Sequence, residues 1–229
     1  MEPGFYNMDC MEAMKQFPDK FFDLAIVDPP YGDGGHNIGG GVRFGQRFDR
    51  YKGDADGWNV GDKVRKKILA WDVAPKDDYF KELFRVSRNQ IIWGGNYFSL
   101  PPARCFVVWD KAIPENFTMA MAEYAWTSIN GNAKIFRKAP NGPANGENRI
   151  HACQKPILLY TWLLKNYAKD GDKILDTHVG SASSLIACHR AGLEYWGFEI
   201  DPIYYEKAKE RLDRETAQVN IMDILGGST

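Results

Sequence analysis

Short, unbroken apolar runs are the feature that most restricts the fold of this chain. Leu24–Val27 is the clearest of them, and four more segments follow it along the sequence: Gln90–Trp93, Cys105–Trp109, Lys173–Leu175 and Tyr195–Phe198. Strands without polar alternation are typical of a parallel sheet covered on both faces. Helical spacing or helix-end signals separate these runs at Tyr79–Val86, after Pro156, from Ser183 to about Ala191, and after Asp201. We therefore predict an α/β fold with a doubly wound, mostly parallel sheet.

Size and composition restrict the class of protein further. The 229 residues are 44% hydrophobic, which suits a single domain over 1–229 with a substantial core. A net charge of −1 provides no overall positive field, so any contact with nucleic acid requires a local basic surface. No apolar run reaches the roughly 18 residues of a membrane span, and the amino end lacks a signal-peptide pattern. Four cysteines without a Cys-x-x-Cys pair predict reduced thiols in a cytoplasmic protein.

Asp28-Pro29-Pro30-Tyr31 directly follows the buried run Leu24–Val27. The carboxyl ends of strands are where α/β folds bind ligands, and the two prolines stiffen the segment. The Asp28 carboxylate and the Pro29 carbonyl are acceptors, which suits a substrate that carries an –NH2 group. Asp28 could offset the charge that develops on an alkylated amine and accept its proton, while the Tyr31 ring could stack on a planar base. A surface turn is the alternative interpretation.

A second polar segment, Asp176–Ser183, lies between the strand Lys173–Leu175 and a predicted helix. A strand, a turn of small residues and a helix N-terminus form a site for a nucleoside or dinucleotide. Glu199 follows the next strand, where a ribose-binding carboxylate is expected. The spacing fits any nucleoside cofactor, but the turn lacks the G-x-G-x-x-G pattern, which disfavours a dinucleotide.

The combination of D-P-P-Y with a D-x-x-x-G-S turn resembles the S-adenosylmethionine-dependent amino-methyltransferases of DNA, which methylate N6 of adenine or N4 of cytosine. The order of the two motifs is similar to that of the circularly permuted β group. The resemblance covers nearly the whole chain and implies a class I S-adenosylmethionine methyltransferase fold. It also implies a target-base pocket formed by the catalytic residues Asp28, Pro29, Pro30 and Tyr31.

The same resemblance assigns a cofactor site to residues from several parts of the chain. Asp176 to Ser181, with His178 and Gly180, would hold the methionine end of S-adenosylmethionine, and Glu199 would hold the ribose, with Ile200 beside it. His151-x-x-Gln154-Lys155-Pro156 matches the segment that lines the methionine moiety, which brings Lys155 into the site. Asp9 and Cys10 match the position that contacts adenine. Asp9-x-x-Glu12 also spells a helix capping box, and His178 could be a hydrogen-bonded turn histidine.

The cofactor turn departs from the family pattern D-P-F-x-G-S-G-T at three positions: Thr177, His178 and Ala182. If residue 182 requires a positive φ, its alanine costs roughly 1 kcal/mol. A catalytically silent DNA-binding protein with the same fold is therefore an alternative.

Two basic stretches, 32–70 and 110–150, interrupt the pattern of strands and helices. We expect both to be irregular insertions that face DNA, since long loops in compact domains are often functional. Charge and position alone select the candidate DNA-binding residues Arg43, Arg47, Lys66, Lys138 and Arg149. The charged run 63–67 could instead be a solvated surface.

The resemblance implies methylation of double-stranded DNA, with the target base flipped out of the duplex. In this family Asp at the first motif position is more common for adenine N6 and Ser for cytosine N4, so adenine is expected and cytosine is the alternative. Methylation of a protein glutamine is disfavoured by Asp28 and by the motif order. Cytosine C5 chemistry is disfavoured because no cysteine follows a proline. No metal is expected, and relatives suggest a possible homodimer.

Overall fold

The computed structural model describes residues 1–32, 73–116, 120–140, 150 and 154–226, with side chains described as far as Ala217. The described strands form one eight-stranded sheet in the order β1-β8-β7-β2-β3-β5-β4-β6. They are Gly4–Asn7 (β1), Phe22–Val27 (β2), Ser87–Trp93 (β3), Phe106–Asp110 (β4), Ala122–Thr127 (β5), Lys134–Arg137 (β6), Lys173–Asp176 (β7) and Glu194–Glu199 (β8). Only β5 pairs antiparallel with its neighbours, β3 and β4, so the predicted mostly parallel sheet is confirmed.

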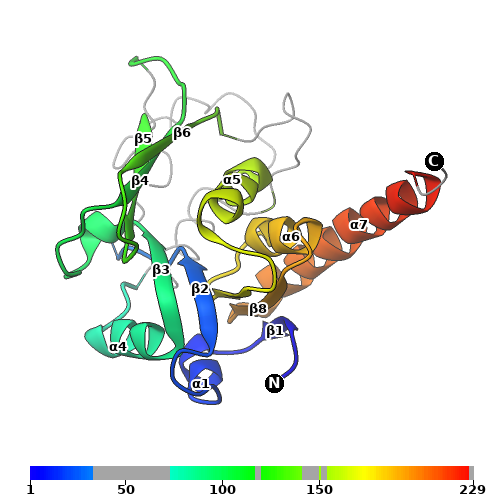
Figure 1. Ribbon diagram of the computed structural model, residues 1–229, viewed down its shortest axis with the longest axis horizontal. Helices are drawn as coiled ribbons and strands as arrows, with labels where there is room; N and C mark the ends of the chain where they lie inside the picture. The colour runs from blue at the N-terminus through cyan, green and yellow to red at the C-terminus, as the bar shows by residue number, and fades with distance from the viewer. Residues whose placement is uncertain (33–72, 117–119, 141–149, 151–153, 227–229) are drawn as a thin grey trace, which may run out of the picture.

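Helices cover both faces of the sheet (Figure 1), which confirms the doubly wound arrangement. They are Cys10–Met14 (α1), Asp77–Val86 (α4), Ile157–Tyr167 (α5), Ser183–Arg190 (α6) and Pro202–Gly226 (α7), and Gly95–Tyr97 forms a short 3₁₀ helix (η1). α1 and α4 lie together on one face, and α5, α6 and α7 lie on the other. The carboxyl-terminal part of α7 extends away from the sheet (Figure 1).

Two hydrophobic cores explain why β2 has no polar alternation. Leu24 and Ile26 pack on the side of α5, α6 and α7, whereas Ala25 and Val27 pack on the side of α1 and α4. A central strand with both faces buried excludes water from every side chain, so the sequence contains an uninterrupted apolar run. Each such side chain contributes about 1.5–3 kcal/mol through burial, which fixes the position of the strand and of the residues that follow it.

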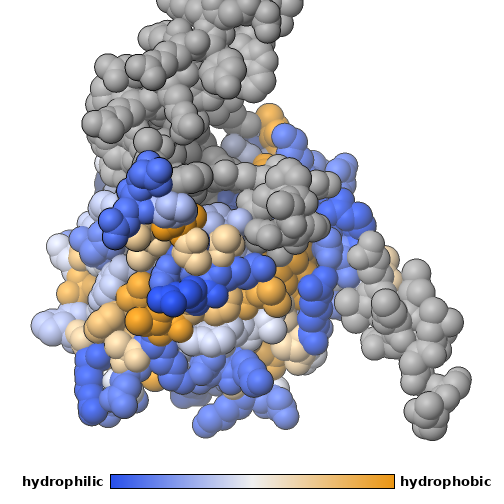
Figure 2. Space-filling view, turned by 90° about the horizontal axis from the view of Figure 1, so that it is seen from above, coloured by the Kyte–Doolittle hydropathy of each residue, from blue (hydrophilic) through white to orange (hydrophobic). Residues whose placement is uncertain are grey.

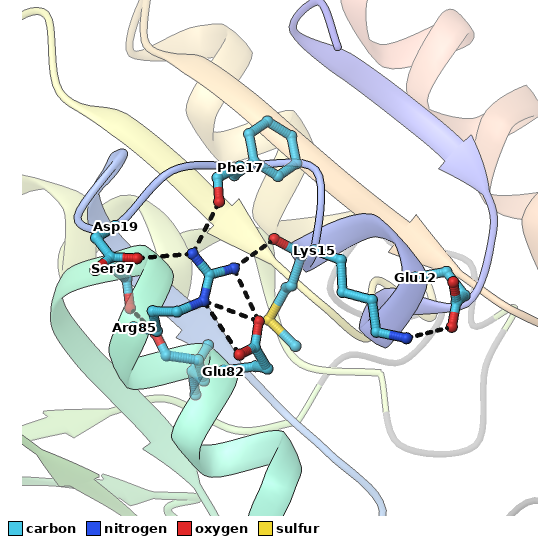
Figure 3. Close-up of polar contacts among 9 residues, drawn as sticks. Glu12, Lys15, Phe17, Asp19, Glu82, Arg85 and Ser87 are labelled. Carbon is cyan, nitrogen blue, oxygen red and sulfur yellow. Dashed lines mark hydrogen bonds and ion pairs between the residues drawn. The ribbon is translucent and has the colours of Figure 1, made fainter.

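Arg85 holds α4 to the segment that follows α1. Its guanidinium donates to the carbonyl oxygens of Phe17 and Met14, at 2.9 and 3.0 Å, and pairs with Asp19 at 2.9 Å and Glu82 at 2.8 Å (Figure 3). Arginine can satisfy several acceptors at once because its five N–H groups have a fixed planar geometry. These contacts join α4 to the end of α1 and to the segment after it, beside the core that both helices share.

The start of α7 and the end of α6 lie where the sequence predicts them. Asp201 accepts hydrogen bonds from the amides of Ile203 and Tyr204, at 2.8 and 3.1 Å, and so caps α7 ahead of Pro202. The predicted helix 183–191 is α6, and Gly192 follows it with φ +66°. Among the described residues, no helix combines the length and apolar character that crossing a membrane requires.

The expectation of irregular structure throughout 110–150 was wrong, because β5 and β6 lie within that stretch. Both strands belong to the mixed part of the sheet and are less buried than β2. In Lys134–Arg137 burial alternates along the strand, but the residue types do not, because two apolar residues lie between two cations. No alternating sequence pattern therefore marked this strand in advance. The other stretch, 33–72, lies outside the described residues.

Candidate active site

The two sequence motifs lie on neighbouring strands at the same edge of the sheet. Asp28 follows β2 and Asp176 ends β7, and these strands are parallel with Leu24 opposite Ile174. Glu199 ends β8, the neighbour of β7 on its other side. Segments that are about 150 residues apart in the sequence therefore meet, because the carboxyl ends of parallel strands share one edge.

The Asp28 carboxylate is bound on both oxygens by side chains of the chain itself. Tyr31 donates its hydroxyl to Oδ1 at 2.7 Å, and the ammonium of Lys155 contacts Oδ2. A carboxylate has about four lone-pair positions, so both oxygens can still accept a further hydrogen bond. Asp28 is thus a hydrogen-bond acceptor at the strand end, with one ammonium and one hydroxyl as partners.

Lys155 belongs to a chain of four alternating charges that sequence reasoning did not find. Its ammonium is also 3.2 Å from Glu123 Oε2, and Glu123 Oε1 is 2.7 Å from Lys111 Nζ. The Lys155 side chain is only 3% exposed, and its charge lies 5.1 Å from the centre of the Trp93 ring. Two cations and two carboxylates balance each other, which is the condition under which buried charges are tolerated.

The pKa of Glu123 reflects this balance. Burial alone raises the pKa of a carboxyl group, but the neighbouring charges of Lys155 and Lys111 outweigh burial and hold the pKa of Glu123 below its ordinary value. Glu123 is therefore ionised at neutral pH and fixes Lys155 against Asp28. Lys155 was expected in the cofactor site, and its observed partners place its ammonium beside the predicted base pocket.

The Tyr31 ring packs directly against the backbone of Gly94, the residue after β3. A Cβ atom at position 94 would come within 2.1 Å of a Tyr31 ring carbon, and Gly94 has φ +66°. Both the close approach and the backbone conformation require glycine. The position of the Tyr31 ring is therefore fixed by its hydroxyl at one end and by Gly94 along the ring.

Asp176 is a buried carboxylate at the start of the predicted cofactor turn. It accepts hydrogen bonds from the backbone N–H of His178, at 3.0 Å, and from the hydroxyl of Ser184. Burial raises its pKa to about 7, and the charges of Asp28 and Glu199 act in the same direction. A bound cation at this position would favour the ionised form, so Asp176 suits a ligand with an ammonium group.

Glu199 holds the turn and the start of α7 through its carboxylate. Oε2 accepts the N–H of Gly180 at 2.9 Å, and Oε1 accepts the N–H of Asp201 at 3.0 Å. Burial raises the pKa of Glu199, and these backbone donors counter part of the rise. Ile200 is 64% exposed at the same edge, so the predicted ribose and adenine side of the site presents an acidic group beside an apolar one.

Ala182 adopts the conformation that the family pattern assigns to glycine. Its φ of 61° and ψ of 17° are in the left-handed region, immediately before α6. Arg211 of α7 stabilises the turn by donating to the Ser181 carbonyl at 2.6 Å and to Ser183 Oγ at 2.9 Å. The fully buried Ala182 methyl group packs in the core, which offsets part of the backbone strain.

The remaining predicted cofactor residues have well-defined local contacts. Asp9 Oδ1 accepts the N–H groups of Met11 and Glu12, at 2.7 and 3.2 Å, so its capping role is confirmed. Burial and the charge of Asp9 raise the pKa of Cys10 to about 12, so this thiol stays protonated. His178 Nδ1 lies 2.9 Å from Thr177 Oγ1, and burial lowers the pKa of His178 to about 4. It is a neutral, hydrogen-bonded histidine.

Four of the five predicted DNA-binding residues lie outside the described residues: Arg43, Arg47, Lys66 and Arg149. His151, from the segment expected to line the methionine moiety, lies outside them as well. Lys138 follows β6 and is half-buried at the far end of the same sheet edge as Asp28. Figure 2 shows hydrophilic and hydrophobic residues interspersed over the described part of the face seen from above. The described residues contain no group of three or more His, Cys, Asp or Glu side chains suited to a metal ion.

Solved structures with a similar arrangement define the fold class. The M1.HpyAVI complex with S-adenosylmethionine matches with a TM-score of 0.55 and 18% identity, covering 91% of this chain and 98% of that one. The cytosine-N4-specific PvuII DNA methyltransferase matches with a TM-score of 0.54 and 13% identity, covering 96% of this chain and 93% of that one. The chain therefore has the class I S-adenosylmethionine methyltransferase fold, as predicted.

Sequence comparisons then identify the family. The type II methyltransferase M.HpaI of Haemophilus parainfluenzae is 37% identical over 245 residues, which cover 94% of this chain and 76% of that protein. The family model of the N6/N4 DNA methylases matches residues 55–210. The chain belongs to this DNA methylase family of amino-methyltransferases, which confirms the resemblance drawn from the two motifs.

Proposed function

We propose that this protein transfers a methyl group from S-adenosylmethionine to the exocyclic N6 amine of adenine in double-stranded DNA. The observation that carries the proposal is the Asp28 carboxylate, bound by Lys155 and Tyr31 on the strand next to Asp176. The family supports a DNA amine as the acceptor, and M1.HpyAVI, which has the same fold, binds S-adenosylmethionine.

The described cofactor residues fit S-adenosylmethionine. Asp176 is a buried acid with a pKa of about 7, suited to the ammonium of the methionine end, and Glu199 offers carboxylate oxygens to ribose hydroxyls. The bound cofactor supplies a methyl group already activated by a sulfonium. The chain needs to orient the acceptor amine and remove its proton, and no metal is required for either step.

The tetrapeptide would act on the amine in two ways. The amine N–H groups would donate to Asp28 and to the Pro29 carbonyl, which localises the nitrogen lone pair for attack. As the new N–C bond forms and the S–C bond breaks, positive charge grows on nitrogen beside the Asp28 carboxylate. The amine proton then passes to Asp28 and on to solvent, a contribution of about 10²–10⁴ in rate.

Substitution of Asp28 tests the proposal. Asp28→Ala should lower methyl transfer to unmethylated genomic DNA by about 10²-fold or more, while calorimetry shows S-adenosylmethionine binding within a few-fold of the wild type. Asp213→Ala, a change of the same type at an exposed position on α7, is the control and should leave transfer unchanged. Wild-type turnover by Asp28→Ala would remove Asp28 from the mechanism.

Cytosine N4 is the second candidate acceptor, because the PvuII enzyme with the same fold is cytosine-N4-specific. Mass spectrometry of nucleosides from DNA treated with the enzyme and isotope-labelled cofactor separates the two. We expect labelled N6-methyldeoxyadenosine. Labelled N4-methyldeoxycytidine would show that cytosine N4, and not adenine N6, is the acceptor. Cofactor binding without any labelled nucleoside would favour a catalytically silent DNA-binding protein.

A further inference from the structure

Tyr97 covers the tyrosine of the catalytic tetrapeptide. It ends the 3₁₀ helix η1, which follows β3, the strand next to β2. The Tyr97 and Tyr31 rings are stacked with centroids 4.8 Å apart and planes only 7° from parallel. An aromatic side chain that the motifs did not indicate therefore lies against the ring expected to receive the target base.

This pair is closer and flatter than the stacked pair of the core, Tyr6 and Phe198, whose centroids are 6.0 Å apart with planes at 25°. Other core rings, such as Phe17, Phe22 and Trp196, meet in tilted or edge-on pairs with angles of 57° to 82°. Tyr97 is 44% exposed, and it is the one aromatic residue among the large hydrophobic side chains that are exposed in the described part of the chain. A large ring that remains in water adds little to folding, so its flat stacking at the site edge points to a planar ligand.

We propose that Tyr97 binds the flipped base by stacking, with Tyr31 on the opposite side of the base. This inference rests on the proposed function and adds a base-binding residue outside the tetrapeptide. In the DNA-free chain Tyr97 would fill the place of the base against Tyr31, which keeps both aromatic rings partly covered. When the base enters, two tyrosine–base stacks replace one tyrosine–tyrosine stack.

The local structure indicates which of the two rings moves. A base between two rings requires two stacking intervals of about 3.4 Å, so the planes of the two rings, which now lie in direct contact, must separate by about one further interval. Tyr31 is fixed by its hydrogen bond to Asp28 and by its contact with Gly94. Tyr97 lies on a three-residue 3₁₀ helix outside the sheet, so movement of its side chain would leave the strands in place.

The test compares Tyr97→Gln, which removes the ring but suits an exposed position, with Tyr97→Phe, which keeps the ring. We expect Tyr97→Gln to raise the KM for DNA by about 10-fold or more, with Tyr97→Phe within about 3-fold of the wild type. Calorimetric affinity for S-adenosylmethionine should be unchanged in both. Tyr195→Leu is the control, because it removes a half-buried tyrosine from the amino end of β8, at the opposite edge of the sheet.

A second readout reports base flipping directly. With 2-aminopurine at the target position of a mapped site, the wild type should raise its fluorescence more than Tyr97→Gln does. The inference fails if Tyr97→Gln has wild-type KM and fluorescence, if Tyr97→Phe is equally impaired, or if Tyr195→Leu raises the KM as much. A wild type that methylates no DNA would remove the proposed function and the inference with it, whereas an active wild type with an unaffected Tyr97→Gln removes the inference alone.

Discussion

Replacing Lys155 by methionine would leave two carboxylates without their shared cation. Methionine keeps most of the aliphatic stem and its contact with Trp93, so the change removes mainly the charge. Asp28 and Glu123 would then be close to each other without Lys155 between them. Lys111 would still neutralise Glu123, so the unbalanced charge falls mainly on Asp28.

The expected loss of stability follows from the burial of these groups. Breaking a buried ion pair by removing one partner costs about 3–5 kcal/mol. Here Lys155 is almost fully buried, but the Asp28 and Glu123 side chains are 17% and 27% exposed, so water screens part of the unbalanced charge. We therefore expect Lys155→Met to lower the free energy of unfolding by about 2–4 kcal/mol at pH 7.

The loss should depend on pH in a defined direction. The folded-state pKa of Glu123 is below its ordinary value, so its ion pairs stabilise the chain above about pH 4.3 and stop doing so as the pH falls through the lowered value. Below that pH, protonation of Glu123 removes its charge and with it the repulsion in Lys155→Met. The difference between the wild type and the variant should therefore shrink from pH 7 toward pH 3.5.

Urea unfolding followed by circular dichroism measures this difference. Lys81→Met is the matched control, because Lys81 also pairs with an aspartate, Asp78 at 2.9 Å, but the two side chains are 74% and 77% exposed. An exposed pair contributes about 0–1 kcal/mol. Equal losses in the two variants, or a Lys155→Met loss below about 1 kcal/mol, would refute the view that Lys155 neutralises a buried acidic centre.

Two further predictions concern the cofactor turn. The folded-state pKa of Asp176 is raised to about 7, so between about pH 4 and 7 the folded chain binds a proton that the unfolded chain has lost, and stability falls as the pH rises through that window. Asp176→Asn should remove about 2–4 kcal/mol of this fall between pH 5 and 8. Urea unfolding measures it, and an equal pH dependence of the unfolding free energy in the wild type and the variant would contradict the prediction. For Ala182→Gly, relief of about 1–2 kcal/mol of left-handed strain is offset by about 0.8 kcal/mol of lost methyl burial and about 0.5–1 kcal/mol of glycine entropy. The free energy of unfolding, measured in urea, should therefore change by less than about 1 kcal/mol. A gain above about 2 kcal/mol would mean that the backbone strain at Ala182 is not offset.

The residues that the sequence located most directly lie at the carboxyl ends of central strands. Asp28 follows β2, and Asp176 and Glu199 are the last residues of β7 and β8, whose buried positions leave a short apolar run in the sequence. Because parallel strands end at one edge, a correct assignment of the strands was enough to bring these carboxylates together. The capping aspartates, Asp9 and Asp201, were equally accessible because a cap acts within four residues.

Glu123 and Lys111 could not be found in this way. They meet because β4 and β5 pair antiparallel, with Asp110 opposite Ala122, and neither strand pairing nor register follows from a short polar-apolar segment. The one available signal in Ala122–Thr127 was the spacing of two aromatic residues, Tyr124 and Trp126, which lie two positions apart after Glu123. Tyr97 was missed for a related reason, since its contact with Tyr31 depends on β2 and β3 being neighbours.

The DNA-free contacts of the tetrapeptide bear on how the site can open. Asp28 and the Tyr31 ring are each bound by the chain, through Lys155, the Tyr31 hydroxyl and Tyr97. Because each Asp28 oxygen can still accept a further hydrogen bond, the target amine can donate to Asp28 while Lys155 and the Tyr31 hydroxyl stay in place. The main cost of reaching the reactive arrangement is then the few kcal/mol needed to unstack the base. A carboxylate that keeps its partners in both states is preformed, so the binding energy of DNA can be used to extract the base.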